Sequence, residues 1–123
     1  MIAICEVWGK YLYVKVIGEF DPIKARDVFS EWTEFARSHS LNKVLCDVTQ
    51  VMGFDAESSS VIARFASSEF IARLFPKGLR LSILETTRQL AKDGFDENML
   101  VNRGAMVKVT HNLQNALEWL GMT

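Results

Sequence analysis

The sequence has little cysteine, little histidine and no excess of charge of either sign. Its 123 residues include two cysteines, two histidines, and 14 basic against 15 acidic residues, which gives a net charge of −1. A chain this close to neutral lacks the basic surface that DNA, RNA or an anionic membrane attracts. We therefore expect no nucleic-acid partner.

Long apolar runs are also missing. None approaches the roughly 20 residues that a helix needs to cross a bilayer, so we expect no membrane span. The first residues, MIAICEVWGKYLYVKV, contain Glu6 and Lys10 and are typical of strands rather than of a signal peptide. These absences favour a cytoplasmic protein, and the length predicts a single domain over residues 1–123.

The few cysteines and histidines do not form a recognisable ligand set. Cys5 and Cys46 lie in separate apolar runs without a C-x-x-C pair, and we interpret both as small buried hydrophobic side chains. His39 and His111 have no Cys, Asp or Glu at ligand spacing nearby. Gly-rich phosphate-binding motifs are absent too. We predict no metal site and no cofactor.

Apolar periodicity predicts nine elements. Alternating residues at 2–8 and 11–19, separated by Gly9-Lys10, predict an antiparallel hairpin. Asp21-Pro22 favours the start of a helix that reaches the polar stretch 37–40. The remaining predicted strands are residues 43–48, 79–84 and 105–109, and the remaining helices begin near Asp55, Asp96 and Asn112.

The resulting order is ββαβαβαβα. Strands that alternate with helices favour parallel, right-handed crossovers, so the sequence predicts one α/β domain with a mixed sheet of about five strands. We expect Trp119 and Leu120 to pack the last helix onto this sheet.

This order, with its opening hairpin, resembles the STAS domain, the fold of anti-sigma-factor antagonists. The family places a strand ending in Asp, then a short loop, then D-S-x-G at the start of a helix. In LCDVTQVMGFDAESSS, residues 45–60, Asp47 takes the place of the strand-end Asp and Asp55 that of the motif Asp.

A second stretch is similar to an uncharacterised bacterial STAS-like group. That group has a pattern like F-x-E-x-x-x-x-N-R-G, followed by a strand and a helix ending A-L-x-W-L. Residues 95–121, FDENMLVNRGAMVKVTHNLQNALEWLG, fit this pattern. The matching residues are Glu97, Asn102, Arg103, Gly104, Ala116, Leu117, Trp119 and Leu120.

The resemblance implies helices mainly on one face of the sheet and a non-enzymatic interaction or regulatory module with a protein partner. In the family a partner kinase phosphorylates the motif Ser, and the added charge controls docking. That Ser falls on Ala56 here, and the motif Gly falls on Ser58. The chain therefore lacks the phosphoacceptor at the motif position.

Two interpretations of residues 55–60 remain open. Ser58, Ser59 and Ser60 are candidates for a regulatory or docking site, because a helix N-terminus favours an added phosphate. Asp55 and Glu57 instead favour a plain helix start, since Asp55 can cap the first N–H groups and both carboxylates would repel a phosphate. The second interpretation agrees better with the charges.

Catalysis has no motif to support it. G-x-S-x-G is absent. His111 is expected at the same sheet edge as Ser58, but nothing in the sequence links it to a serine. We therefore expect a protein that is not an enzyme.

The outer side of the hairpin is a candidate interface. Alternation places Tyr11, Tyr13, Lys15 and Ile17 on the face opposite Leu12, Val14 and Val16, and Trp8 can join the first set. Such a face is a partner surface, a ligand groove, or a surface covered by a terminal element. We favour partner contact, with a homodimer first. RNA binding by base stacking on these rings is disfavoured, because no basic residues cluster around them. The alternative function is binding of a small ligand, a lipid or a nucleotide.

Asn102 and Arg103 are candidates for an anion site or for a structural role. Gly104 is expected to take the left-handed conformation that ends the preceding helix. Arg103 would then pair with Glu97 or Asp96, or bind an anion.

Overall fold

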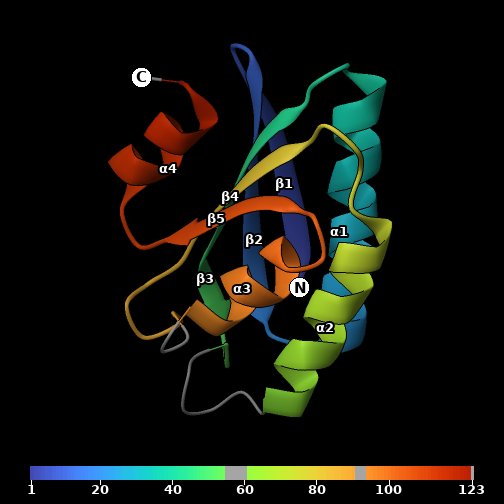
Figure 1. Ribbon diagram of the computed structural model, residues 1–123, viewed down its shortest axis with the longest axis vertical. Coiled ribbons are helices and arrows are strands. Elements are labelled where there is room, and N and C mark those ends of the chain that lie inside the picture. Colours follow the sequence, from blue (N-terminus) through green and yellow to red (C-terminus); the bar gives the residue numbers. More distant parts are fainter. Residues whose placement is uncertain (55–60, 91–93, 123) are drawn as a thin grey trace.

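The computed structural model describes residues 1–54, 61–90 and 94–122. Their order is ββαβαβαβα, as predicted (Figure 1). The elements are β1 (Ile2–Trp8), β2 (Tyr11–Glu19), α1 (Pro22–Ser38), β3 (Lys43–Met52), α2 (Val61–Leu74), β4 (Arg80–Leu84), α3 (Phe95–Val101), β5 (Met106–Thr110) and α4 (Leu113–Leu120).

The strands form one mixed sheet in the order β1-β2-β3-β4-β5. β1 and β2 pair antiparallel from Trp8 opposite Tyr11 to Ile2 opposite Ile17. Gly9 supplies the positive φ, +65°, that the tight turn between them requires. All the other neighbours pair parallel, because a helix connects each of those strands to the next.

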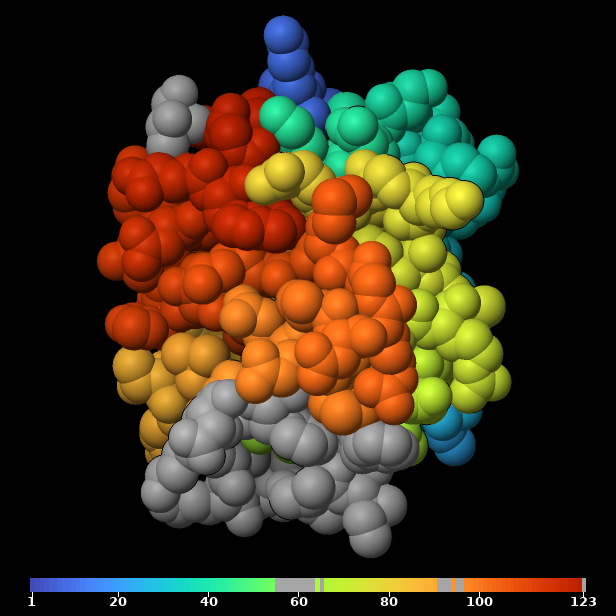
Figure 2. Space-filling model, in the orientation of Figure 1, coloured from blue at the N-terminus to red at the C-terminus, as the bar shows by residue number. Residues whose placement is uncertain are grey.

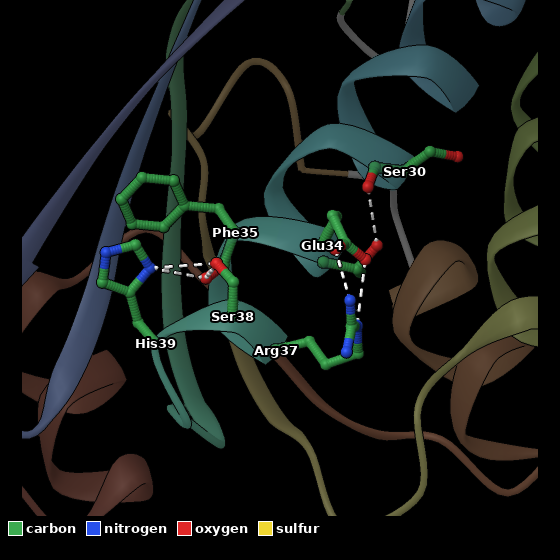
Figure 3. A network of polar contacts seen from close by, with 7 residues as sticks. Ser30, Glu34, Phe35, Arg37, Ser38 and His39 are labelled. Carbon is green, nitrogen blue, oxygen red and sulfur yellow. Dashed lines mark hydrogen bonds and ion pairs between the residues drawn. The ribbon is translucent and has the colours of Figure 1, made fainter.

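The first helix begins and ends as its sequence indicates. The Asp21 carboxylate accepts hydrogen bonds from the backbone N–H groups of Ile23 (2.9 Å) and Lys24 (3.1 Å). At the other end, the His39 ring stacks on Phe35 with centroids 4.1 Å apart, and its Nδ1 lies 2.9 Å from the Phe35 carbonyl oxygen (Figure 3). His39 is therefore part of the helix end.

Three helices cover one face of the sheet and the fourth covers part of the other, which confirms helices mainly on one face (Figure 1). On the first face, side chains of α1, α2 and α3 pack on the inward rows of the strands. On the second face, α4 packs Ala116 and Leu120 on Leu45. The Ser82 hydroxyl donates to the Ala116 carbonyl (2.8 Å) and fixes α4 to β4.

Trp119 and Leu120 both pack on the sheet, but to different degrees. Leu120 is 1% exposed, whereas Trp119 is half-buried with the Arg80 guanidinium 4.4 Å from its ring centroid. The expected packing role therefore belongs mainly to Leu120. Trp119 instead connects α4 to β4 through the cation–π contact of its ring with Arg80.

Two predicted boundaries were wrong. The strand predicted at 43–48 continues to Met52, because β2 and β3 resume pairing after an irregularity, with Ile17 opposite Gln50. The Gln89 amide supports this extension by donating to the carbonyls of Val48 (2.8 Å) and Val51 (3.0 Å).

The second error concerns the start of α3. Its N-cap is Gly94, with φ +64° and no side-chain cap, and the predicted cap Asp96 lies within the helix. Glycine adopts this left-handed conformation with little strain. The helix therefore begins directly after Gly94, which lies two residues before the predicted cap. At the other end, Gly104 has φ +90°, in the left-handed region as predicted.

Both cysteines are free thiols in apolar surroundings. Cys46 is buried, and burial first, then the charge of Asp47, raises its pKa to about 12. Cys5 is half-buried, and burial together with the Glu31 charge raises its pKa as well. Cys46 therefore behaves as the buried hydrophobic side chain we expected, and Cys5 does so in part.

We predict that Leu120→Ala lowers the free energy of unfolding by about 2–5 kcal/mol, because it leaves a cavity between α4 and the sheet. Leu113→Ala is the matched control on the same helix, since Leu113 is 50% exposed. That substitution should cost less than about 0.5 kcal/mol. Urea unfolding of both variants measures the difference, and equal losses would show that Leu120 does not anchor α4.

Candidate functional site

The outer side of the β1–β2 hairpin is the part of the second sheet face that α4 leaves open. We define this surface, the hairpin face, by its outward side chains. They are Ile2, Ile4, Glu6, Trp8, Tyr11, Tyr13, Lys15 and Ile17. In the space-filling view the tip of the hairpin projects beyond its neighbours (Figure 2).

Apolar exposure on this face is concentrated on β1. Ile2 is 58% exposed, Ile4 43% and Trp8 44%. Tyr11 and Tyr13 are half-buried because they pack against the cluster formed by α4 and Leu45. The terminal helix therefore covers part of the predicted aromatic surface and leaves Trp8 open.

A row of side chains holds the hairpin face rigid across three strands. The Trp8 ring stacks on Tyr13 with centroids 4.3 Å apart and an interplanar angle of 8°. The Trp8 indole N–H donates to the Glu6 carboxylate (2.8 Å), and the Tyr13 hydroxyl donates to Asp47 on β3 (2.9 Å). Thr49 in turn donates to the other Asp47 oxygen through its hydroxyl (2.6 Å).

Electrostatics in this row keep Tyr13 protonated. Burial, and then the hydrogen bond and negative charge of Asp47, raise the pKa of Tyr13 to about 12. The phenol is neutral at physiological pH, as an ordinary tyrosine is, and the raised pKa extends its role as a hydrogen-bond donor to more alkaline solution. The arrangement presents fixed rings and aliphatic side chains, which suits contact with another surface.

The two edges of the sheet differ in how they are protected. At β5, the Glu97 carboxylate accepts from the Val109 backbone N–H (2.7 Å), so α3 covers part of that edge. β1 has β2 on one side and, within the described part of the chain, no strand on the other. Its seven residues carry one charge, Glu6, and no proline or lysine. Natural edge strands usually carry such protection against pairing.

The other sequence candidates lie elsewhere. Asp55, Glu57, Ser58, Ser59 and Ser60 fall outside the described residues. His111 is exposed where β5 ends.

Asn102 and Arg103 are exposed just after α3. The Arg103 guanidinium lies 2.6 Å from the Glu69 carboxylate of α2, a partner the sequence did not indicate. Glu97, one expected partner, instead binds the β5 backbone. These residues lie on the helix-covered side of the sheet and do not join the hairpin face.

Sequence reasoning missed four contributors to the hairpin face. Ile2, Ile4 and Glu6 share the parity of Trp8, so extending the alternation through the first strand would have found them. Asp47 was identified only as a motif position. Its contact with Tyr13 depends on the parallel register of β2 and β3, which the sequence does not reveal.

Comparison with known proteins supports the fold. A solved structure described as an anti-sigma factor antagonist from Mycobacterium paratuberculosis is similar, with a TM-score of 0.61 and 13% sequence identity. The match covers 97% of this chain and 92% of that one, so the predicted STAS-like fold is confirmed. A scan of protein-family models found no match, and a search of curated proteins found no significant one.

Two kinds of structural feature are absent from residues 1–54, 61–90 and 94–122. In that part of the chain, no helix is long and apolar enough to cross a membrane. Over the same residues, no group of three or more His, Cys, Asp or Glu side chains is arranged to hold a metal ion.

We predict that Tyr13 ionises late in a spectrophotometric pH titration, near pH 12. Tyr13→Phe should remove this step and leave that of Tyr11, and Asp47→Asn should lower the pKa of Tyr13 because the accepting charge is gone. The pKa of Tyr13 is higher in the folded than in the unfolded state. Its contribution to the free energy of unfolding is therefore fully present below a pH of about 10 and is lost as the pH rises through about 12. Ionisation of both tyrosines near pH 10 would contradict the Asp47 contact.

Proposed function

We propose that this chain is a non-enzymatic protein-interaction module with a regulatory role, and that it docks through the hairpin face. The exposure of Ile2, Ile4 and Trp8 on an uncovered sheet face is the observation that carries this proposal. Exposed aliphatic and aromatic side chains that gather on one uncovered sheet face are a common mark of an interaction site. The likeness to an anti-sigma factor antagonist agrees with a regulatory role.

A docking role fits the chemistry of this surface better than catalysis. The Tyr13 hydroxyl donates to Asp47 and stays protonated, and the Trp8 N–H donates to Glu6. These contacts use the polar atoms of the row to fix its rings. A rigid aromatic anchor loses little conformational entropy on binding, which favours its use in protein contacts.

We propose that the partner of this surface is a second copy of the chain and that the two copies pair along β1. A two-fold axis perpendicular to the sheet would pair two β1 strands antiparallel and keep residues of the same parity opposite one another. An axis at Ile4 places each Ile4 opposite the other and avoids placing Glu6 opposite its own copy, where like charges would repel. This arrangement brings the outward rows of the two β1 strands side by side, so that Ile2 and Ile4 of each copy contact cross-strand residues of the other.

Regulation in this proposal does not use the phosphoacceptor of the STAS motif. Ala56 stands at that position and has no hydroxyl. The neighbouring Asp55 and Glu57 carboxylates disfavour a second negative group on the adjacent serines. Control would therefore act on the docking surface itself, through competition between the second copy and another protein.

The decisive experiment is sedimentation equilibrium of the full chain and two variants. We expect the wild type to form a dimer and Ile4→Lys to be a monomer, because the two new ammonium groups would lie opposite one another across the β1 pair and repel. Ile23→Lys is the matched control, since Ile23 is 68% exposed in the first turn of α1. It should remain a dimer.

A monomeric wild type at all concentrations would contradict self-pairing along β1. Equal weakening by Ile4→Lys and Ile23→Lys would show that the effect is one of charge alone. Circular dichroism of each variant separates loss of association from loss of folding.

We also predict that the Ser58/Ser59/Ser60→Ala triple variant keeps the wild-type association constant. Intact-mass spectrometry of the protein from its native cells should find no phosphate on these serines. Substantial phosphate on any of them, together with altered association in the variant, would restore the switch interpretation.

A further inference from the structure

A cavity lies on the opposite side of the sheet from the hairpin face, between the strands and the three helices that cover them. Its volume is about 130 Å³. Apolar side chains form most of its wall, among them Val28 and Trp32 of α1, Ile71 of α2 and Ile83 of β4. We refer to it as the inner cavity.

One polar group in the wall has no partner. The Ser67 side chain of α2 is 7% exposed and lines the inner cavity. Its hydroxyl oxygen is buried and, within the described part of the chain, forms no hydrogen bond. Buried hydroxyl groups are normally satisfied, so the Ser67 hydroxyl is available to form a hydrogen bond with a molecule in the cavity.

Arg64, Ser68 and Glu85 are the other polar side chains of the wall, and Arg64 is fixed by the protein. The buried Arg64 guanidinium donates to the Gln89 carbonyl (3.0 Å) and lies 4.6 Å from the centre of the Phe54 ring. These contacts hold the cation against the chain, so Ser67 is the side chain that we assign to a ligand.

The size and polarity of the cavity define the class of ligand. An apolar cavity of roughly 150 Å³ stays dry and takes up benzene, because water finds no partners there and a ring restores lost dispersion contacts. Pockets for drug-sized ligands are larger, about 300–1,000 Å³. The inner cavity is therefore too small for a nucleotide or a whole lipid, and its wall offers a phosphate little polar contact.

We propose that the inner cavity binds a compact, uncharged molecule about the size of one aromatic ring, with a single hydrogen-bonding atom that meets the Ser67 hydroxyl. Phenols and aromatic alcohols belong to this class. The ring would contact α1, α2 and the inward side of the sheet together. This site lies on the other side of the sheet from the hairpin face and does not depend on self-association.

The test compares phenol with benzene as probes of the full chain. Titrations followed by ¹³C–¹H correlation spectra should show both probes shifting the methyl signals of Ile71 and Ile83, with phenol binding at least tenfold more tightly. Ser67→Ala should bring the two affinities to within about threefold, because the cavity remains while the hydroxyl is gone. Ser82→Ala is the matched control, since it removes a buried serine hydroxyl on the α4 side. It should keep the wild-type ratio.

Ala25→Leu adds bulk to the cavity wall and should abolish binding of both probes. Absence of methyl shifts with either probe at millimolar concentration in the wild type would overturn the proposal and identify the cavity as a packing void. An unchanged affinity ratio in Ser67→Ala would overturn the role of Ser67. This second outcome can be read even if Ala25→Leu does not fold.

Discussion

The burial of one row of side chains on β2 is the constraint on which the rest of the structure depends. Leu12, Val14 and Val16 are almost completely removed from solvent beneath the helices. Because side chains alternate along a strand, burying this row places Tyr11, Tyr13 and Lys15 on the other side. A slip of one residue would exchange the two rows, so the hydrophobic effect that holds α1 on the sheet also determines which residues the hairpin face presents.

The placement of α4 divides that second face into a covered and an open part. Leu120 and Ala116 cover β3 and β4, where Leu45 requires burial, and the helix is too short to extend over the hairpin. The boundary runs through the aromatic row, so that Tyr13 is half-buried against the α4 cluster and Trp8 is open. Tyr13 is held by its hydrogen bond to Asp47, and the exposed Trp8 stacks on it. The proposed docking surface is therefore bordered by ring side chains that the protein itself positions.

The two proposed sites lie on opposite sides of one sheet. The hairpin face consists of exposed rings and aliphatic groups whose polar atoms are satisfied within the protein. The inner cavity has a mostly apolar wall that includes the Ser67 hydroxyl, which forms no hydrogen bond within the described part of the chain. β2 and β3 contribute to both, since their inward residues line the cavity and their outward residues hold the aromatic row.

The sequence by itself determined the order of elements, the hairpin turn, the caps at Asp21 and Asn112, and the parity of each strand. These features follow from periodicity and from local backbone chemistry, which act over a few residues. It also indicated Trp8, Tyr11 and Tyr13 as a surface. Only the tertiary structure decided that β3 extends beyond Val48, that Tyr13 reaches Asp47 and that Arg103 meets Glu69. It also decided where the cavity lies, because register and helix packing join residues far apart in the chain, and such pairings leave no local pattern to read.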